Sequence, residues 1–289
     1  IDSGSTLNLT SVTNAVAFGF SGSGNSGIID GTYVASDSGF NVITTTDGSN
    51  TLVKISSTGS ITNNINSTNS CIIGSLPTIL FENGSNYFHT NSSTLHYIPG
   101  ATWQANATAT LEGNSSGISS SSLNFGNLVI NCTGFSGILG AFNALTSKTI
   151  QGNLIVNSTG TGRLRAVTTG VLTINGNLQI NAGIFEVGSN NGSVIVKGTT
   201  TVASGSTLDF NRGSLKNQGN MILNGNALSS ETSTVNSYLE FSGSGVPQTL
   251  SGTGTFTGRI SNLGVSNPLG LTLSTPLVTE NVYLIAGTI

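Results

Sequence analysis

The sequence predicts an all-β protein folded as a parallel β-helix (β-solenoid) with about three short strands in each coil. Three observations predict this fold. A short unit recurs every ~22 residues, apolar and polar residues alternate with a period of two, and no segment keeps a helical period of 3.6 residues. The chain has 289 residues, which is long enough to bury a sizeable core.

The repeated unit is Gly-Asn-Leu-x-(Ile/Val)-Asn. Successive copies begin 26, 24, 22 and 21 residues apart. A repeat of this length is typical of a solenoid, because one unit cannot bury its apolar face alone and must stack on its neighbours. The copies are GNLVIN at 126–131, GNLIVN at 152–157 and GNLQIN at 176–181, with looser copies GTTTVA at 198–203 and GNMILN at 219–224.

The alternating pattern predicts that each unit forms a β-strand. Leu178 and Ile180 point to one face of such a strand, and Gln179 points to the other. About three such runs fall in each period, separated by the Gly, Asn and Ser residues that turns favour. Each run has one apolar face, so we expect successive coils to stack with parallel strands about 4.8 Å apart and to enclose an apolar interior.

The main alternative is a tandem of two antiparallel β-sandwich domains, whose strand spacing of about 8–12 residues also fits. The unequal, glycine-punctuated repeats favour the solenoid. Composition divides it into sections 1–76, 77–125 and 126–289, of which 77–125 contains a group of aromatic residues and 126–289 the regular repeats. The recurring asparagines of the repeat can share hydrogen bonds between coils or simply reflect the preference of Asn for turns.

Composition excludes several classes of function. Charged residues make up 7% of the chain, against roughly 25% in ordinary soluble domains, and the net charge is −3. No basic patch is present to bind nucleic acid, and the apolar runs are far shorter than the ~20 residues that span a bilayer. Because the chain starts at Ile1 and ends inside a strand-like pattern, we expect a section of a longer polypeptide.

The segment 77–113 departs from the repeat. It contains both histidines, the only tryptophan and two of the five tyrosines. Such aromatic side chains either form an exposed surface that stacks on sugars or on a protein partner, or fill a wider coil of the solenoid. The candidate binding residues are Tyr87, His89, Tyr97 and Trp103.

The order of features from this segment onward resembles that of repetitive secreted cell-surface proteins of the Bacteroidetes, over roughly residues 75–289. The resemblance implies export by type IX secretion, an extracellular or cell-surface location and a role as adhesin or fibre. The partners it implies are the export machinery, glycans and other copies or domains of the surface protein. The matching features are Tyr87–His89, Ile98–Trp103, Gly126–Leu128 and Asn131–Gly134.

Little in the sequence suggests a catalytic site or a metal site. Glu186 and Asp209 are 23 residues apart and could stack on adjacent coils with Arg212 and Lys216 nearby. Glycosidases use two carboxyl groups about 5–10 Å apart, but such a pair can equally be two solvated side chains. The two histidines and two cysteines lack the spacing of a metal site, and no cofactor motif is present. Cys71 and Cys132 are either two buried thiols or a disulfide.

We therefore expect a structural or adhesive section of a large secreted bacterial surface protein, forming a stiff β-helical rod, and not an enzyme. Two alternatives remain open. One is a carbohydrate-active β-helix enzyme, a polysaccharide lyase or glycoside hydrolase, that uses carboxylates such as Glu186 and Asp209. The other is a glycan-binding module that uses the aromatic residues of 77–113.

Overall fold

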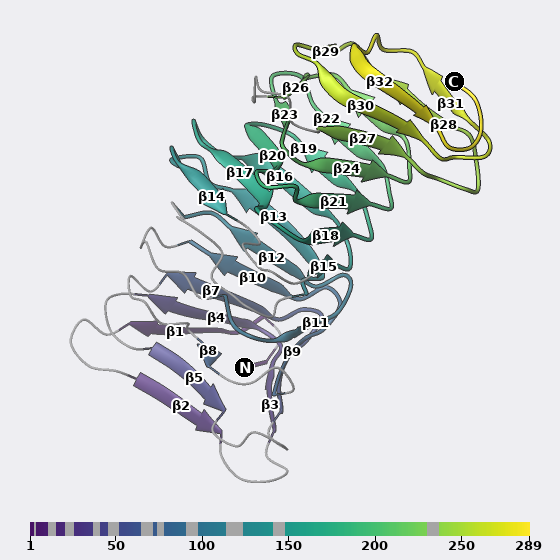
Figure 1. Cartoon of the computed structure of the whole chain (residues 1–289). Helices are drawn as coiled ribbons and strands as arrows, with labels where there is room; N and C mark the ends of the chain where they lie inside the picture. The colour runs from purple at the N-terminus through teal and green to yellow at the C-terminus, as the bar shows by residue number, and fades with distance from the viewer. Residues whose placement is uncertain are drawn as a thin grey trace. The chain divides into compact units, whose positions relative to one another are not determined.

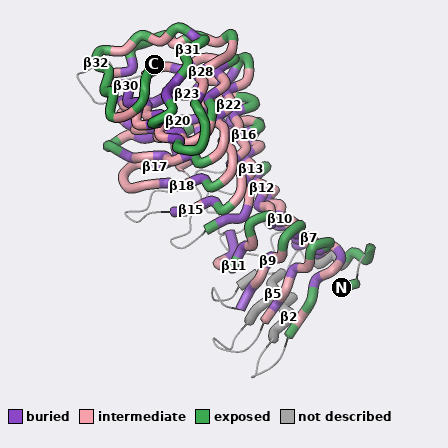
Figure 2. The backbone as a smooth tube through the Cα atoms, turned by 90° about the vertical axis from the view of Figure 1, so that its right-hand side faces the viewer, coloured by how far each residue is buried: buried purple, intermediate pink, exposed green. Residues whose placement is uncertain are grey.

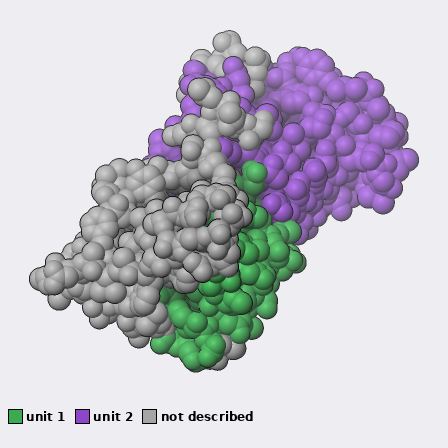
Figure 3. Space-filling view, turned by 90° about the horizontal axis from the view of Figure 1, so that it is seen from below, with its two compact units in different colours: residues 1–135 green, residues 136–289 purple. Residues whose placement is uncertain are grey.

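The computed structural model confirms the all-β parallel solenoid, and the residues it describes form no helix (Figure 1). The chain divides into two compact units, unit 1 at residues 1–135 and unit 2 at residues 136–289 (Figure 3). The section boundaries after residues 76 and 125 were drawn from composition and stay predictions. The described residues are 1–2, 4–10, 16–20, 26–36, 41–45, 52–64, 72–73, 78–90, 98–113, 124–140, 148–229 and 237–289.

Unit 1 contains three groups of parallel strands, each named here after its first strand. In the β1 sheet the order is β1 (Thr6–Thr10), β4 (Thr32–Ser36), β7 (Ser60–Asn64), β10 (Asn86–His89), β12 (Thr108–Leu111) and β13 (Asn127–Asn131). The β2 sheet holds β2 (Val16–Phe20), β5 (Asn41–Thr45) and β8 (Ile72–Ile73). The β3 sheet holds β3 (Ser26–Ile29), β6 (Leu52–Ile55), β9 (Ile79–Phe81) and β11 (Thr102–Trp103).

Unit 2 repeats this plan with three ladders of six, seven and six strands. The β14 sheet holds β14 (Ile138–Gly140), β17 (Arg163–Val167), β20 (Ile184–Gly188), β23 (Thr207–Asn211), β26 (Asn226–Leu228) and β29 (Thr255–Phe256). The β15 sheet holds β15 (Lys148–Ile150), β18 (Val171–Ile174), β21 (Ser193–Val196), β24 (Ser214–Asn217), β27 (Tyr238–Phe241), β30 (Ile260–Val265) and β32 (Thr279–Leu284). The β16 sheet holds β16 (Leu154–Ser158), β19 (Leu178–Ile180), β22 (Thr200–Val202), β25 (Met221–Leu223), β28 (Gln248–Ser251) and β31 (Leu271–Leu273).

Apart from β12 and β13, consecutive described strands enter different sheets, so each coil contributes about three strands, as the repeat predicts. The alternation also holds. Leu178 and Ile180 are fully buried, whereas Gln179 between them is partly exposed. Figure 2 shows this change between buried and partly exposed positions along the strands of unit 2. Inward side chains of one coil lie beside those of the next, as Val202 lies beside Ile180, and together they form a continuous apolar core.

The corner that precedes the β16 sheet explains the Gly-Asn pair of the repeat. The Asn153 Oδ1 atom accepts a hydrogen bond of 2.8 Å from the backbone N–H of Asn177, and Asn177 Oδ1 accepts one of 2.8 Å from Thr199. A Cβ atom on Gly176 would lie only 2.5 Å from Asn153 Oδ1. The glycine therefore makes room for the asparagine of the preceding coil, whose side-chain oxygen binds backbone at this corner.

At the last position of the repeat, side-chain amides of adjacent coils do bond to each other directly. The Asn181 Nδ2 atom donates to Asn157 Oδ1 at 2.9 Å. Amide sharing between coils is thus seen for Asn157 and Asn181, whereas the described bonds of the second-position Asn153 and Asn177 join their side chains to backbone. Of the two cysteines, Cys132 is buried in unit 1 and Cys71 lies outside the described residues.

Two neighbouring residues of β19 test the assignment of inside and outside. We expect Leu178→Ala to lower the free energy of unfolding by about 2–5 kcal/mol, because it removes a fully buried side chain and leaves a cavity. The matched change Gln179→Ala removes a partly exposed side chain and is expected to cost about 0.5 kcal/mol or less. Urea unfolding followed by circular dichroism measures both, and equal losses would contradict the assignment.

Candidate functional site

The aromatic residues predicted as a binding surface lie inside unit 1. Tyr87, His89 and Trp103 are each 1% exposed or less, so the prediction that they form an exposed contact surface is wrong. They fill the coil interior, which is the second interpretation that the sequence left open. Tyr97 lies outside the described residues.

These side chains form a packed aromatic cluster. The rings of Phe81 and Trp103 stack with centroids 4.0 Å apart, and Tyr87 packs edge-on against both at 6.1 Å. The Tyr87 hydroxyl lies 3.1 Å from Asn63 Nδ2, which donates to it, and 3.2 Å from His89 Nδ1. The cluster therefore stabilises the core of unit 1, and the polar atoms of Asn63, Tyr87 and His89 bond to one another inside it.

The carboxylates Glu186 and Asp209 do lie on adjacent coils, as their spacing predicts. They pair in register between β20 and β23, and Arg165 of β17 is in register with Glu186 on the other side. Glu186 is on the face of β20 opposite to Phe185 and Val187, yet its side chain is 0% exposed. Burial of a carboxylate demands partners, and the neighbouring strands supply them.

The partners of Glu186 are two arginines and an asparagine. Arg165 Nε donates to its Oε1 at 2.5 Å, Arg163 Nη1 to its Oε2 at 3.3 Å, and Asn211 Nδ2 to its Oε1 at 3.0 Å. Asp209 accepts from Arg163 Nη1 at 3.3 Å and from the backbone N–H of Asn211 at 2.9 Å. Asn211 has a positive φ of 46°, a conformation that Asn tolerates better than most residues.

Of the two cations proposed from the sequence, Lys216 does not belong to this cluster, and Arg163 and Arg165 bind the carboxylates instead. The arginines that bind the carboxylates precede Glu186 by one coil, a relation that the repeat length could have revealed. Lys216 instead donates to Glu240 Oε1 at 3.1 Å in the β15 sheet, away from Glu186. Two arginines and two carboxylates cancel in charge, and the partners of Glu186 occupy both of its oxygens. The geometry is that of an ion-pair network which ties three successive coils together.

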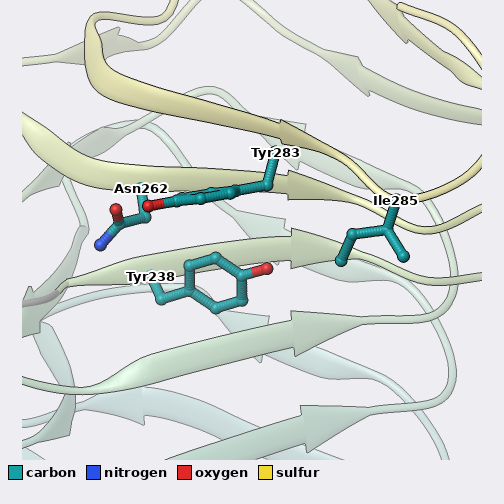
Figure 4. A pocket seen from close by; sticks show the side chains of 4 residues that line it. All are labelled: Tyr238, Asn262, Tyr283 and Ile285. Atoms are coloured by element: carbon teal, nitrogen blue, oxygen red, sulfur yellow. The ribbon is translucent and has the colours of Figure 1, made fainter.

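A different feature lies on the outward face of the β15 sheet. A hollow of about 380 Å³ is lined by Tyr238, Asn262, Tyr283 and Ile285 (Figure 4). Tyr238 and Asn262 pair in register between β27 and β30, and Tyr283 follows on β32. Burial, followed by the nearby Glu240 carboxylate and then Tyr283, raises the pKa of the Tyr238 phenol. The phenol is therefore protonated at neutral pH and can donate a hydrogen bond.

Among the described residues, no group of three or more His, Cys, Asp or Glu side chains is arranged to hold a metal ion. The same residues contain no helix long and apolar enough to cross a membrane. Comparison of the chain with protein-family models, curated proteins and solved structures found no match.

The ion-pair network predicts a large effect of one conservative change. We expect Glu186→Gln to lower the free energy of unfolding by about 3 kcal/mol, because it leaves Arg165 without its counter-charge and Arg163 with Asp209 alone. This value is at the lower end for broken buried pairs, since the Arg163 and Arg165 side chains keep 34% and 23% of their exposure. Urea unfolding measures the change.

The matched control is Glu280→Gln. Glu280 pairs with Arg259 at 2.6 Å on the exposed surface, and we expect its loss to cost about 1 kcal/mol or less. Equal stability of Glu186→Gln and wild type would contradict a structural role for the network.

Proposed function

We propose that this chain is a non-catalytic structural and adhesive section of a larger secreted bacterial surface protein. Its stacked coils form a stiff β-helical rod. Its uncharged outer face makes many weak contacts with glycans or with other copies of the chain. The proposal combines the resemblance to Bacteroidetes surface proteins with the arrangement of the outward-facing side chains.

The observation that carries the proposal is a row of small uncharged polar residues on the β1 sheet. Five strands in succession place one such residue in register on the outer face. Some of them bond along the row, since Ser60 Oγ donates to Thr32 Oγ1 at 3.1 Å. A regular array of hydroxyl and amide groups suits repeated weak contacts, whose avidity grows with their number. The row consists of Thr32, Ser60, Asn86, Thr108 and Asn127.

The state of the acidic pair supports the non-catalytic part of the proposal. A glycoside hydrolase needs one carboxyl group to donate a proton and another to act as nucleophile or base at an open cleft. Glu186 is enclosed and bonded to three side chains, and Asp209 is 2% exposed. The carboxylate oxygens of neither Glu186 nor Asp209 are accessible to a substrate in this arrangement.

The exposed edge of unit 2 supports fibre formation. Val282 and Leu284 of β32 are in register with the buried Leu263 and Val265 of β30, and so belong to the inward row. They are nevertheless 51% and 59% exposed, and the far edge of β32 pairs with no strand among the described residues. Within the larger protein that we propose, this edge and its apolar row are covered either by a following coil or by a strand from another copy.

Sedimentation velocity over a range of concentrations tests the assembly. We expect the wild-type chain to form larger species as its concentration rises, and the double change Val282→Lys with Leu284→Lys to stay monomeric, because two charges then oppose burial of the edge. Ile138→Lys, which alters an exposed residue of β14, is the matched control and should assemble like wild type.

Polysaccharide digestion distinguishes the enzyme alternative. Release of reducing or unsaturated ends by wild type, and its loss in Asp209→Asn, would overturn the proposed function. No release, together with concentration-dependent assembly, is the expected result.

A further inference from the structure

The hollow on the β15 sheet is built around an aromatic ring laid across a glycine. Tyr238 stands on β27, and its ring reaches over Gly264 of β30. A Cβ atom at position 264 would lie 2.0 Å from the Tyr238 Oη atom and 2.7 Å from its Cζ atom. Any other residue at 264 would force this ring away from the sheet. The glycine therefore fixes the ring as the floor of the hollow.

Tyr283 forms a wall beside this floor. Figure 4 shows the Tyr238 ring face-on and the Tyr283 ring edge-on. The Tyr283 hydroxyl points toward Asn262, and Ile285 lies at the opposite end of the hollow. Tyr283 and Ile285 are largely exposed, and Ile285 follows β32 directly. The two rings and the isoleucine give the hollow a mainly apolar lining.

Polar groups stand at its rim in fixed orientations. The Asn262 Oδ1 atom accepts from Asn281 Nδ2 at 3.2 Å, and Asn262 Nδ2 donates to the Ser237 carbonyl at 3.4 Å. These bonds leave the second N–H of the Asn262 amide available to a ligand. Neither tyrosine hydroxyl has a hydrogen-bond partner within the described residues, so both can bond to a ligand as well.

The charges nearby are already compensated. Glu240, whose outward position is in register with Gly264, accepts from Lys216 at 3.1 Å and from Ser266 Oγ at 2.5 Å. The hollow therefore presents no unpaired charge to a ligand. This feature favours a neutral ligand over a phosphate, a carboxylate or an ammonium group.

A pyranose ring matches this chemistry. One of its faces is lined by C–H groups and packs on an aromatic ring, and its hydroxyl groups bond to amide and phenol groups at the edge. The volume of about 380 Å³ is at the lower end of the range for small-molecule sites, which suits one or two sugar units. We propose that the hollow lined by Tyr238, Asn262, Tyr283 and Ile285 binds a neutral hexopyranose unit of a polysaccharide.

This inference rests on the adhesive part of the proposed function and gives it a location. A shallow site for one or two sugars binds weakly by itself. Its effect depends on many copies meeting a polymer that carries many sugars, which is the condition that a fibre on a surface provides.

The test measures retention of the purified chain on beads coated with neutral glucan, mannan or galactan, with hyaluronate beads as the charged comparison. We expect retention on at least one neutral polymer, and a fall of about tenfold for Tyr283→Ala, which removes the wall. Gly264→Ala should give a similar fall, because it displaces the Tyr238 ring while leaving both tyrosines present.

Two controls keep the result interpretable. Val246→Ala changes an exposed apolar residue that does not line the hollow and should leave retention unchanged. Circular dichroism melting shows whether each variant folds, and competition by the free monosaccharide shows that the sugar itself is bound. Retention that ignores both Tyr283→Ala and Gly264→Ala would overturn the inference, as would the lack of retention on any neutral polymer.

The two proposals can fail separately. A chain that assembles but binds no neutral polymer retains the structural role and lacks this site. A chain that is retained through Tyr283 and also cleaves the polymer keeps the sugar site and loses the non-catalytic function.

Discussion

The close approach of backbone between successive coils is the constraint on which the rest of the structure depends. At the corner of each GNLxIN unit in unit 2, an asparagine oxygen binds the backbone N–H of the next coil directly above a glycine. This contact holds the coils at ladder spacing and in one register. Every column of side chains must then be compatible along its length, because each residue touches its counterparts above and below. Inward columns are apolar for this reason.

The same rule governs charge on the outer columns. A lone carboxylate in a column would face a neighbour only about 5 Å away and would need a partner there. Arg165, Glu186 and Asp209 occupy one column in that order. Arg165 attracts Glu186, and Arg163 binds both carboxylates and so offsets the repulsion between them. The β1 sheet instead carries an outer row of Ser, Thr and Asn, which can stack without repulsion. The low charge of the chain is thus a consequence of in-register stacking. The adhesive surface that we propose follows from that low charge.

The repeat period and the alternation were enough to predict the solenoid and the pairing of Glu186 with Asp209, because both depend only on spacing along the chain. The burial of Tyr87 could not be predicted with the same ease. In the run Asn86–His89 aromatic residues fall on both faces, and the pattern alone does not say whether Tyr87 or Phe88 points inward. The tyrosine hollow was missed because its members are 24 and 21 residues apart in coils of unequal length, so that register decides their contact.

Gly264 is the residue that links fold to function most directly. A glycine inside a strand costs about 0.5–1 kcal/mol relative to alanine, and most glycines of the repeat offset this cost by allowing backbone to approach at corners. Gly264 lies within a six-residue strand, where its outward position is met by the Tyr238 ring and not by backbone. A serine or threonine would continue the outer column at no such cost. The stability lost by placing glycine in this strand is therefore tied to keeping the Tyr238 ring flat on the surface. A flat ring beside the second ring of Tyr283 is better suited to contact with a ligand than to stabilising the strand ladder.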